Sequence, residues 1–434
     1  MAHSPRWRRA RALALAAGLL LVTPLAGGAA AQANGTPQAA GSGGEHWVNG
    51  WQGSPTAGGT FDQASCPADT GLDDQTVRNI VPVSTAGGQV RVRISNAFGA
   101  TPLLVGAASV GVAGQGAGTS PGTLRPVLFD GRPTLLIAAG GEALSDPVAL
   151  PVQPLQRLAV SVFLPGRTGP ATQHDNSRET NYLASSNRTG DAAASPFTRR
   201  IGCWMFASGV DVLAPARVAG AVVTLGDSIT DGDHSSIDAD QRYPDWLARR
   251  LAARPGTTLS VSNAGIGGNE LLLNRVPELF GVSAPARLPR DVLTQAGARS
   301  VVLLEGINDI GAEGARAGDL IDVYEQIATQ VHAAGLPVYI GTLVPFGGSN
   351  AGYGADYGSA QGEAQRRAVN DWIRSQRLFD GVVDFDAALH DPADPSRLLP
   401  QYDSGDHLHP SDAGYRRMAE TVDVTRLVAA SSRR

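Results

Sequence analysis

The stretch Ala221-Val222-Val223-Thr224-Leu225-Gly226-Asp227-Ser228-Ile229-Thr230 decides the fold of this chain. Its first five residues are apolar or β-branched, which is typical of a short strand buried on both faces of a parallel sheet. A glycine then permits a tight turn, and a serine follows two residues later. Because ligands bind at the carboxyl ends of strands in open α/β sheets, we expect Ser228 to lie at a binding edge.

Three later segments carry the groups that a nucleophilic serine requires. They are residues 263–269 (NAGIGGN), 306–309 (GIND) and 406–410 (DHLHP). A serine needs a base to remove its proton, a carboxylate to orient that base, and N–H donors for the oxyanion. His409 is the candidate base, and Asp406 is the candidate carboxylate. The N–H of Ser228, the N–H of Gly268 and the side-chain amide of Asn308 are the candidate oxyanion donors.

Strand and helix patterns alternate over residues 216–434. Apolar runs of strand length occupy residues 218–225, 259–263, 301–305, 336–342 and 382–385. Patterns of helix length occupy residues 243–253, 320–334, 363–377 and 411–427, and Ser411 is placed to cap the last of them. This alternation predicts an α/β domain whose parallel sheet is covered by helices on both faces.

Residues 45–212 have a different pattern, with Gly and Pro at short intervals and no convincing amphipathic helix. Val90, Val92 and Ile94 alternate with polar residues, which is the period of a half-buried strand. Residues 134–138, 147–152 and 158–164 are further strand candidates. The economical prediction is an all-β accessory domain, an antiparallel sandwich or a jelly-roll-like fold, that precedes the α/β domain.

The N-terminus has the pattern of a signal peptide. Arg6, Arg8, Arg9 and Arg11 precede an apolar stretch at residues 12–25, and Ala31-Gln32-Ala33 fits a small-x-small cleavage site. We therefore predict a signal peptide at residues 1–33, a Gly/Ala/Ser/Pro-rich linker at 34–44, and a secreted protein. No later apolar stretch approaches the length needed to span a bilayer.

Charge and cysteine usage narrow the class of protein further. The 434 residues carry a formal net charge of −5, which argues against a nucleic-acid partner, because such a partner would require a basic patch. The two cysteines, Cys66 and Cys203, could pair in an exported protein. Two free, buried thiols are the other interpretation that the count allows.

The four blocks around Ser228, Gly268, Asn308 and His409 occur in the order found in the SGNH hydrolases, also called GDSL esterases/lipases, and the chain resembles this family over roughly residues 216–430. Ile229 replaces the leucine of the nominal GDSL block. The resemblance implies a five-stranded, three-layer parallel α/β sheet and ester hydrolysis without a metal or other cofactor. The segment from Thr76 to Gly99 also resembles the β-sandwich-like N-terminal region of some secreted bacterial members.

Two other motifs have simpler explanations. Gly118-Thr119-Ser120-Pro121-Gly122 matches the Gly-x-Ser-x-Gly elbow, but it lacks the strand–turn–helix context that the elbow requires, so we interpret it as a chance match. His407 and His409 form a His-x-His pair without a further ligand cluster of convincing spacing, so we expect no metal. Adjacent residues in an extended turn point to opposite sides, and this predicts that His407 faces away from the serine.

Three residues beside the catalytic candidates have expected supporting roles. Asp227 and Asp309 are expected to hold their turns by hydrogen bonds. His234 is close to Ser228 in the sequence and is a possible pocket wall. With a reference histidine pKa of about 6.5, a rate that depends on His409 should rise around pH 6–7.

The leading expectation is a secreted serine esterase that acts through an acyl-enzyme on small-molecule or polysaccharide esters. The alternatives are a lipase or phospholipase of the same family, and a carbohydrate- or surface-binding module with a vestigial hydrolase domain. The loop at residues 347–362 is rich in Gly and Tyr and not strongly apolar, which favours short acyl groups or a carbohydrate-like alcohol. The sequence does not indicate the oligomeric state.

Overall fold

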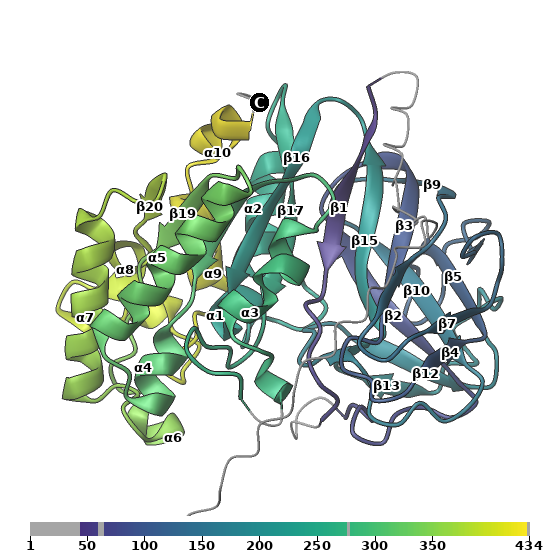
Figure 1. Cartoon of the computed structure of the whole chain (residues 1–434), viewed down its shortest axis with the longest axis horizontal. Helices are drawn as coiled ribbons and strands as arrows, with labels where there is room; N and C mark the ends of the chain where they lie inside the picture. Colours follow the sequence, from purple (N-terminus) through teal and green to yellow (C-terminus); the bar gives the residue numbers. More distant parts are fainter. Residues whose placement is uncertain (1–43, 60–64, 276–277, 432–434) are drawn as a thin grey trace, which may run out of the picture. The chain divides into compact units, whose positions relative to one another are not determined.

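The structure is a computed structural model that describes residues 44–59, 65–275 and 278–431 (Figure 1). The predicted signal peptide, and the linker apart from its last residue, lie outside the described residues. No helix within the described ranges is both long enough and apolar enough to cross a membrane.

The Ser228 stretch forms the end of a strand in a five-stranded parallel sheet, as the sequence predicted. In spatial order the strands are β17 (Thr258–Gly265), β16 (Val218–Gly226), β18 (Ala298–Leu304), β19 (Val338–Gly341) and β20 (Gly381–Val383). The register pairs Gly226 with Gly265 on one side and with Leu304 on the other. The turns that follow β16, β17 and β18 therefore leave the sheet at one edge.

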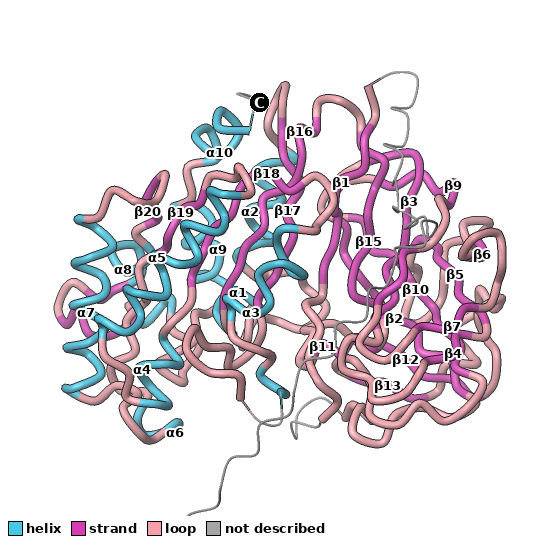
Figure 2. The backbone as a smooth tube through the Cα atoms, in the orientation of Figure 1, coloured by secondary structure: helices cyan, strands magenta, loops and turns pink. Residues whose placement is uncertain are grey.

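Helices lie on both sides of this sheet (Figures 1 and 2). They are α1 (Ser228–Asp231), α2 (Tyr243–Ala252), α3 (Ala284–Leu288), α4 (Ile307–Glu313), α5 (Ala317–Ala333), α6 (Asn350–Tyr353), α7 (Ala360–Ser375), α8 (Phe385–Leu389), α9 (Asp412–Thr421) and α10 (Val424–Ser431). The chain moves from β16 outward to β17 and then back past β16 to β18, so right-handed crossovers place α2 on one face and α3, α5 and α7 on the other. The connections reverse direction at β16, which makes its carboxyl end the expected ligand site.

The prediction of one continuous helix at residues 411–427 was wrong, because the structure has two helices there. Ser411 does cap a helix, because its side chain accepts a hydrogen bond from the Gly414 N–H. However, Val422 is extended, and the Asp423 carboxylate accepts hydrogen bonds from the N–H groups of Thr425 and Arg426. A carboxylate in this position starts a new helix, so the segment divides into α9 and α10.

Residues 45–214, called the β-region below, form a second core. One antiparallel sheet has the order β1 (His46–Gln52), β15 (Ala207–Ala214), β3 (Gly87–Ser95) and β8 (Glu142–Leu144), with β9 (Val148–Val152) also paired to β3. The other has the order β13 (Arg199–Ile201), β12 (Asn181–Ser185), β2 (Gln75–Val83), β10 (Gln156–Leu164), β5 (Ala107–Val112) and β6 (Arg125–Val127). Two short pairs join β4 (Leu103–Val105) to β7 (Leu135–Ile137) and β11 (Gln173–His174) to β14 (Trp204–Met205).

The two large sheets of the β-region share one apolar core. Val90, Val92 and Ile94 of β3 are fully buried, as their alternation predicted, and they belong to the same buried cluster as Val160 and Val162 of β10. This confirms an antiparallel β-domain ahead of the parallel sheet. Its last strand continues to Ala214, two residues beyond the boundary expected at residue 212.

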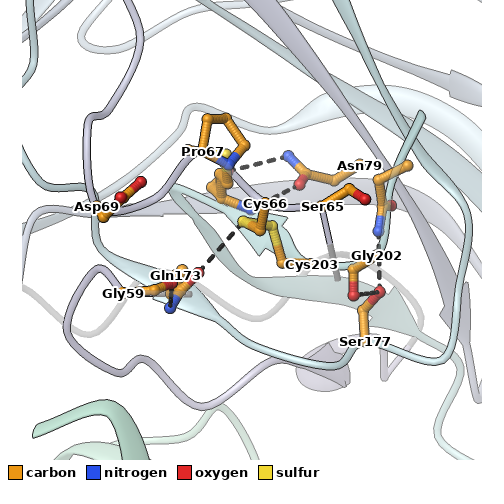
Figure 3. The surroundings of a disulfide bond; sticks show 12 residues. Gly59, Ser65, Cys66, Pro67, Asp69, Asn79, Gln173, Ser177, Gly202 and Cys203 are labelled. Atoms are coloured by element: carbon orange, nitrogen blue, oxygen red, sulfur yellow. Dashed lines mark hydrogen bonds between the residues drawn. A yellow bond between two sulfur atoms is a disulfide. The ribbon is translucent and has the colours of Figure 1, made fainter. Parts of the chain in front are cut away.

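A disulfide joins Cys66 to Cys203 across a separation of 137 residues (Figure 3). A loop of this length corresponds to about 5 kcal/mol of stabilisation in the chain-entropy account. Cys203 directly precedes β14, and the Sγ atom of Cys66 lies 3.3 Å from the Gln173 side-chain oxygen in β11. The bridge therefore fastens the short β11–β14 pair, which carries His174.

The β-region packs against the edge of the parallel sheet. The Ser260 hydroxyl in β17 donates to the Asn49 carbonyl in β1 at 2.5 Å, and the Ser262 hydroxyl bonds the Gln52 side-chain oxygen at 2.6 Å. All four residues are buried. These polar contacts anchor the β-region beside the turns that end the central strands.

Candidate active site

Ser228 begins a short helix directly after the central strand. Gly226 ends β16 where a Cβ atom would lie 2.2 Å from the Leu304 carbonyl oxygen, so only glycine fits there. Asp227 caps α1 by accepting a hydrogen bond from the Ile229 N–H at 2.9 Å, and so holds the turn as expected. Ser228 is the first residue of α1, so its own N–H has no partner within the helix and is free to bind a ligand.

Ser228, His409 and Asp406 form a continuous hydrogen-bonded chain. The Ser228 hydroxyl lies 2.8 Å from His409 Nε2, and His409 Nδ1 lies 2.6 Å from Asp406 Oδ2. The other oxygen of Asp406 accepts the backbone N–H groups of Leu408 and His409, so the carboxylate is fixed by the turn that carries the imidazole. This is the order of groups that moves a proton from a serine hydroxyl to a base.

The electrostatics of the pair favour a charged imidazole. Burial alone would lower the pKa of His409, but its hydrogen bond to Asp406 and the nearby Asp233 carboxylate outweigh burial and raise this pKa above 6.5. Burial would likewise raise the pKa of Asp406, yet the hydrogen bond and charge of His409 hold it well below its usual range. The rate increase expected around pH 6–7 therefore moves upward, to a pH above the reference pKa.

The expected oxyanion donors line the same cavity as Ser228, which has a volume of about 680 Å³. Gly268 has φ +70°, and a Cβ atom there would lie 2.2 Å from Phe280 Cδ1, so the turn requires glycine. Asn308 lies in the first turn of α4 and is buried; its amide nitrogen donates to the Asn269 carbonyl at 2.9 Å. An amide nitrogen carries two hydrogens, so the second is available to a ligand.

Replacing Asn308 with alanine is expected to lower kcat by roughly 10²–10³ with little change in KM, because an oxyanion develops mainly in the transition state. Single-turnover and steady-state hydrolysis of a p-nitrophenyl ester measure both constants. A change confined to KM would contradict this role and leave Asn308 as a substrate-binding group. Tyr357→Phe is the matched control: it removes only the hydroxyl that bonds the far side of the amide, so its effect should be smaller.

Two tyrosines from the Gly- and Tyr-rich loop at residues 347–362 donate hydrogen bonds to two of the catalytic candidates. The Tyr357 hydroxyl donates to Asn308 Oδ1 at 2.7 Å, which orients the amide with its nitrogen away from the tyrosine. The Tyr353 hydroxyl donates to Asp406 Oδ2 at 2.8 Å. Sequence reasoning had assigned this loop only to substrate preference, because nothing in its pattern indicated these two contacts.

His234 and Asp233 add a second layer around the base. The His234 ring stacks on the His409 ring with centroids 5.0 Å apart, and its Nε2 lies 3.3 Å from Asp406 Oδ2. Asp233 Oδ2 lies 3.8 Å from His409 Nε2. Both residues line the cavity, as had been proposed for His234 alone.

These groups also include a possible metal-binding cluster, although no metal was expected from the sequence. Asp233, His234 and His409 each offer a ligand atom, and these atoms lie within 4.8 Å of one another. Both nitrogens of His409 are already engaged, Nδ1 by Asp406 and Nε2 by Ser228. A metal bound through His409 would therefore compete with the serine–histidine–aspartate chain.

The β-region reaches the turn that carries Gly268. His174 Nε2 lies 2.9 Å from Asp231 Oδ1, and His174 Nδ1 lies 2.9 Å from the Ser54 carbonyl oxygen. Both neighbours are acceptors, so both ring nitrogens must carry a proton, and His174 is an imidazolium paired with Asp231. Burial would lower the pKa of His174, but the charge and hydrogen bond of Asp231 raise it. The second oxygen of Asp231 accepts the Gly267 N–H at 3.2 Å, so the ion pair supports the oxyanion turn.

Buried Arg287 links the two turns that the sequence had singled out. Its guanidinium donates to the carbonyl groups of Gly226 and Ala264 and to the side chain of Asn269. Asn269 in turn accepts from Asn308, so one cation holds the ends of β16 and β17 and the oxyanion amide in place. Arg287 also pairs with Asp291, four residues away, but no local pattern in the sequence identified its role, because the groups that it holds at the site lie 18 to 61 residues away.

The structure also places the other residues that the sequence analysis singled out. Asp309 accepts hydrogen bonds from the N–H groups of Leu271 and Leu272, so it holds the segment that follows the Gly268 turn, whereas it had been expected to hold its own turn. Ser120 lies in a turn between β5 and β6 of the β-region, outside the cavity lining. His407 faces away toward Asp403, whose carboxylate lies 2.6 Å from its Nδ1. This orientation was expected from the alternation of side chains in an extended turn, but that reason was wrong, because His407 has φ +65° and is not extended.

Comparisons with known proteins identify a family for the segment that contains these blocks. The sequence profile of the GDSL-like lipase/acylhydrolase family matches residues 224–417. No curated protein matches the chain. Among solved structures, the chain is similar to a putative lipolytic protein of the G-D-S-L family from Desulfitobacterium hafniense (18% identity, TM-score 0.34), with coverage of 46% of this chain and 96% of that one. It is also similar to an aryl esterase from M. smegmatis (17% identity, TM-score 0.38), with coverage of 46% of this chain and 94% of that one. A third similar structure is a GDSL-like lipase from Bacteroides thetaiotaomicron (19% identity, TM-score 0.35), with coverage of 46% of this chain and 85% of that one.

Proposed function

The C-terminal half of this chain is a GDSL/SGNH lipase/acylhydrolase domain, and from this premise we propose that the protein is a secreted serine esterase that hydrolyses carboxylic esters through an acyl-enzyme. The observation that carries the proposal is the hydrogen-bonded chain from Ser228 through His409 to Asp406. It opens into a cavity that Gly268 and Asn308 also line.

In the acylation step, Ser228 Oγ attacks the ester carbonyl carbon while His409 Nε2 takes its proton. Asp406 keeps Nδ1 protonated, so that Nε2 presents a lone pair to the serine, and it stabilises the imidazolium that forms. The raised pKa of His409 makes its neutral imidazole a stronger base, and this neutral form predominates when the pH is above that pKa. The C–O bond to the alcohol then breaks as His409 returns the proton to the leaving oxygen.

The N–H groups of Ser228 and Gly268 and the amide of Asn308 stabilise the oxyanion of the tetrahedral intermediate. Each such donor lowers the barrier by about 3–4 kcal/mol when it is already in place. Arg287 and the His174–Asp231 pair hold these donors before the substrate arrives. Water then attacks the acyl-enzyme by the same sequence of proton transfers and releases the acid.

Secretion rests on the signal-peptide pattern at residues 1–33 together with the Cys66–Cys203 bridge. Disulfides persist in oxidising compartments and are rare in the cytosol. We therefore assign the mature enzyme to the extracellular side, with residues 34–44 as the linker that follows cleavage.

The size and lining of the cavity favour short acyl groups. Ligand sites of about 300–1,000 Å³ enclose small molecules, and the volume of about 680 Å³ suits a short acyl chain with a sugar-sized alcohol. A lipase or phospholipase is the second candidate, favoured by Ile266, Leu279 and Phe280 in the lining and by exposed Leu273 in the segment leading to it.

A panel of p-nitrophenyl esters tests the activity and the acyl length together. We expect turnover of the acetate and butyrate and a kcat/KM at least tenfold lower for the palmitate, because a cavity of about 680 Å³ that is shared with the alcohol limits the acyl chain. A preference for the palmitate would identify a lipase instead. Absence of turnover on every ester would leave a binding module with a vestigial hydrolase domain.

A further inference from the structure

The cavity around Ser228 has two chemically different sides. One side carries Ile266, Leu279 and Phe280 beside the oxyanion turn, with the Arg275 guanidinium 4.9 Å from the Phe280 ring centroid. Its polar side carries Asp175, Asn176 and Asp233. Asp175 and Asn176 come from the β-region, directly after β11, so the β-region forms part of the cavity wall.

The polar side is the side on which an alcohol would leave. His409 gives its proton to the leaving oxygen, so that oxygen must lie within hydrogen-bond reach of Nε2. Asp233 Oδ2 is 3.8 Å from this nitrogen, and Asp233 Oδ1 accepts a hydrogen bond from the Asn176 amide at 2.7 Å. The wall formed by Asp233, Asn176 and Asp175 therefore faces the alcohol part of an ester rather than its acyl part.

Asp175 is a buried carboxyl with an unsatisfied oxygen. The residue is 9% exposed, and no donor among the described residues bonds its Oδ1 atom. Burial raises the pKa of Asp175 to about 6, against the opposing charge of His174. Oδ1 itself has almost no accessible surface, but the carboxyl lines the cavity, so a ligand hydroxyl that donates to Asp175 would replace part of the hydration that burial has removed.

We propose that Asp175 is a specificity-determining residue that accepts a hydrogen bond from a hydroxyl of a polyhydroxylated alcohol, such as the sugar or polyol part of an acyl ester. This inference rests on the proposed esterase function and assigns its substrate class. Asn176, next to Asp175, already donates one amide hydrogen to Asp233, so its second amide hydrogen is the donor left for a neighbouring hydroxyl.

A hydroxyl fits this wall better than an ammonium group. The His174 imidazolium adjoins Asp175 in the chain, and His409 becomes an imidazolium during acylation beside Asp233. A cationic alcohol would repel the imidazolium that forms on His409 and so oppose the proton transfer. A neutral hydroxyl satisfies the carboxylate without adding charge.

The segment that carries Asp175 is held rigidly. His174 is fixed at both ring nitrogens, β11 pairs with β14, and the Cys66–Cys203 bridge lies behind this pair. A polar group that is already ordered loses little freedom when the ligand binds, so it discriminates more strongly between ligands. The β-region therefore contributes specificity rather than a separate binding site.

The test compares esters that share one acyl group and differ in the alcohol. We expect the wild-type kcat/KM for glycerol monobutyrate and for 6-O-butyryl glucose to exceed that for ethyl butyrate. In Asp175→Ala this ratio should fall on the order of tenfold to a hundredfold, because the site no longer accepts the hydroxyl. Asp175→Asn keeps one acceptor oxygen and should retain an intermediate ratio, and it carries the test if the alanine variant does not fold.

The exposed residue Asp73, in the β-region but outside the cavity lining, supplies the matched control. Asp73→Asn removes the same charge and should leave the ratio unchanged. A ratio that Asp175→Ala leaves unchanged would overturn the inference while the esterase function stands. A second outcome would also overturn the inference, in favour of a cation site. In it, the wild type prefers butyrylcholine to the neutral 3,3-dimethylbutyl butyrate, and Asp175→Ala loses that preference. A wild-type protein that hydrolyses no ester would instead overturn the proposed function itself.

Discussion

Replacement of Ser228 with alanine is expected to reduce kcat for ester hydrolysis by roughly 10⁵–10⁶ while the fold is retained. Loss of the nucleophile in a serine triad has an effect of this size, because the remaining groups cannot form an acyl-enzyme. Among the residues that the structure describes, the lost hydroxyl bonds only His409 Nε2, and the residue is already small, so stability should change little. Steady-state hydrolysis of p-nitrophenyl butyrate and a thermal unfolding curve measure the two effects.

A covalent probe provides the control for this assignment. A fluorophosphonate should label wild-type protein at Ser228, and peptide mass spectrometry should find no label on Ser228→Ala. Ser120→Ala should behave like the wild type, because Ser120 lies in a turn of the β-region outside the cavity. Label on Ser120, or full activity in Ser228→Ala, would refute the nucleophile assignment.

The parallel sheet could be predicted because its strands differ from their surroundings in pattern. Residues 221–225 are apolar or β-branched without alternation, and each is fully buried in β16. Such a run, followed by a helix pattern, indicates a strand covered on both faces. The break between α9 and α10 could not be predicted so well, because Asp423 fits the surface of a continuous helix as easily as the cap of a new one.

That Ser228, His409, Gly268 and Asn308 converge on one cavity could also be predicted, since each closely follows a strand or lies in a short block with its partner. The residues that support them could not. Arg287, His174 and Tyr357 act on the ends of other elements, and their roles depend on contacts made only after the sheet has formed. His174 was the least accessible of these, because it lies in the β-region, 57 residues before Asp231, which it bonds.

The β-region contributes contacts to the candidate site. Considered alone, residues 45–212 looked like an accessory domain joined to a complete hydrolase. In the structure, His174 supports the oxyanion turn through Asp231, and Asn176 bonds Asp233 beside the base. A hydrolase region expressed without the β-region would lack both contacts and would expose the apolar and polar surface that β1 covers on β17.

His409→Ala is expected to reduce kcat by a factor of at least 10⁴, whereas His407→Ala should keep most of the activity. Removal of the base leaves the serine without a proton acceptor, and losses of this size are typical of triad bases. His407 is half exposed and its ring bonds Asp403, so its loss affects the shape of the turn rather than the proton transfer. Because φ is +65° at this position, His407→Asn is the better-matched control, since asparagine tolerates the left-handed region.

The pH dependence provides an independent readout for the same residue. The base must be neutral to accept the serine proton, and Asp406 and Asp233 raise the pKa of His409 against the effect of burial. The wild-type kcat/KM should therefore be low below the raised pKa and should increase with pH to a plateau, with the inflection above 6.5. Asp233→Asn removes one of the charges that raise this pKa, so it should move the inflection to lower pH, whereas His407→Asn should leave it in place. An inflection that moves in His407→Asn but not in Asp233→Asn would mean that the titrating base is not His409.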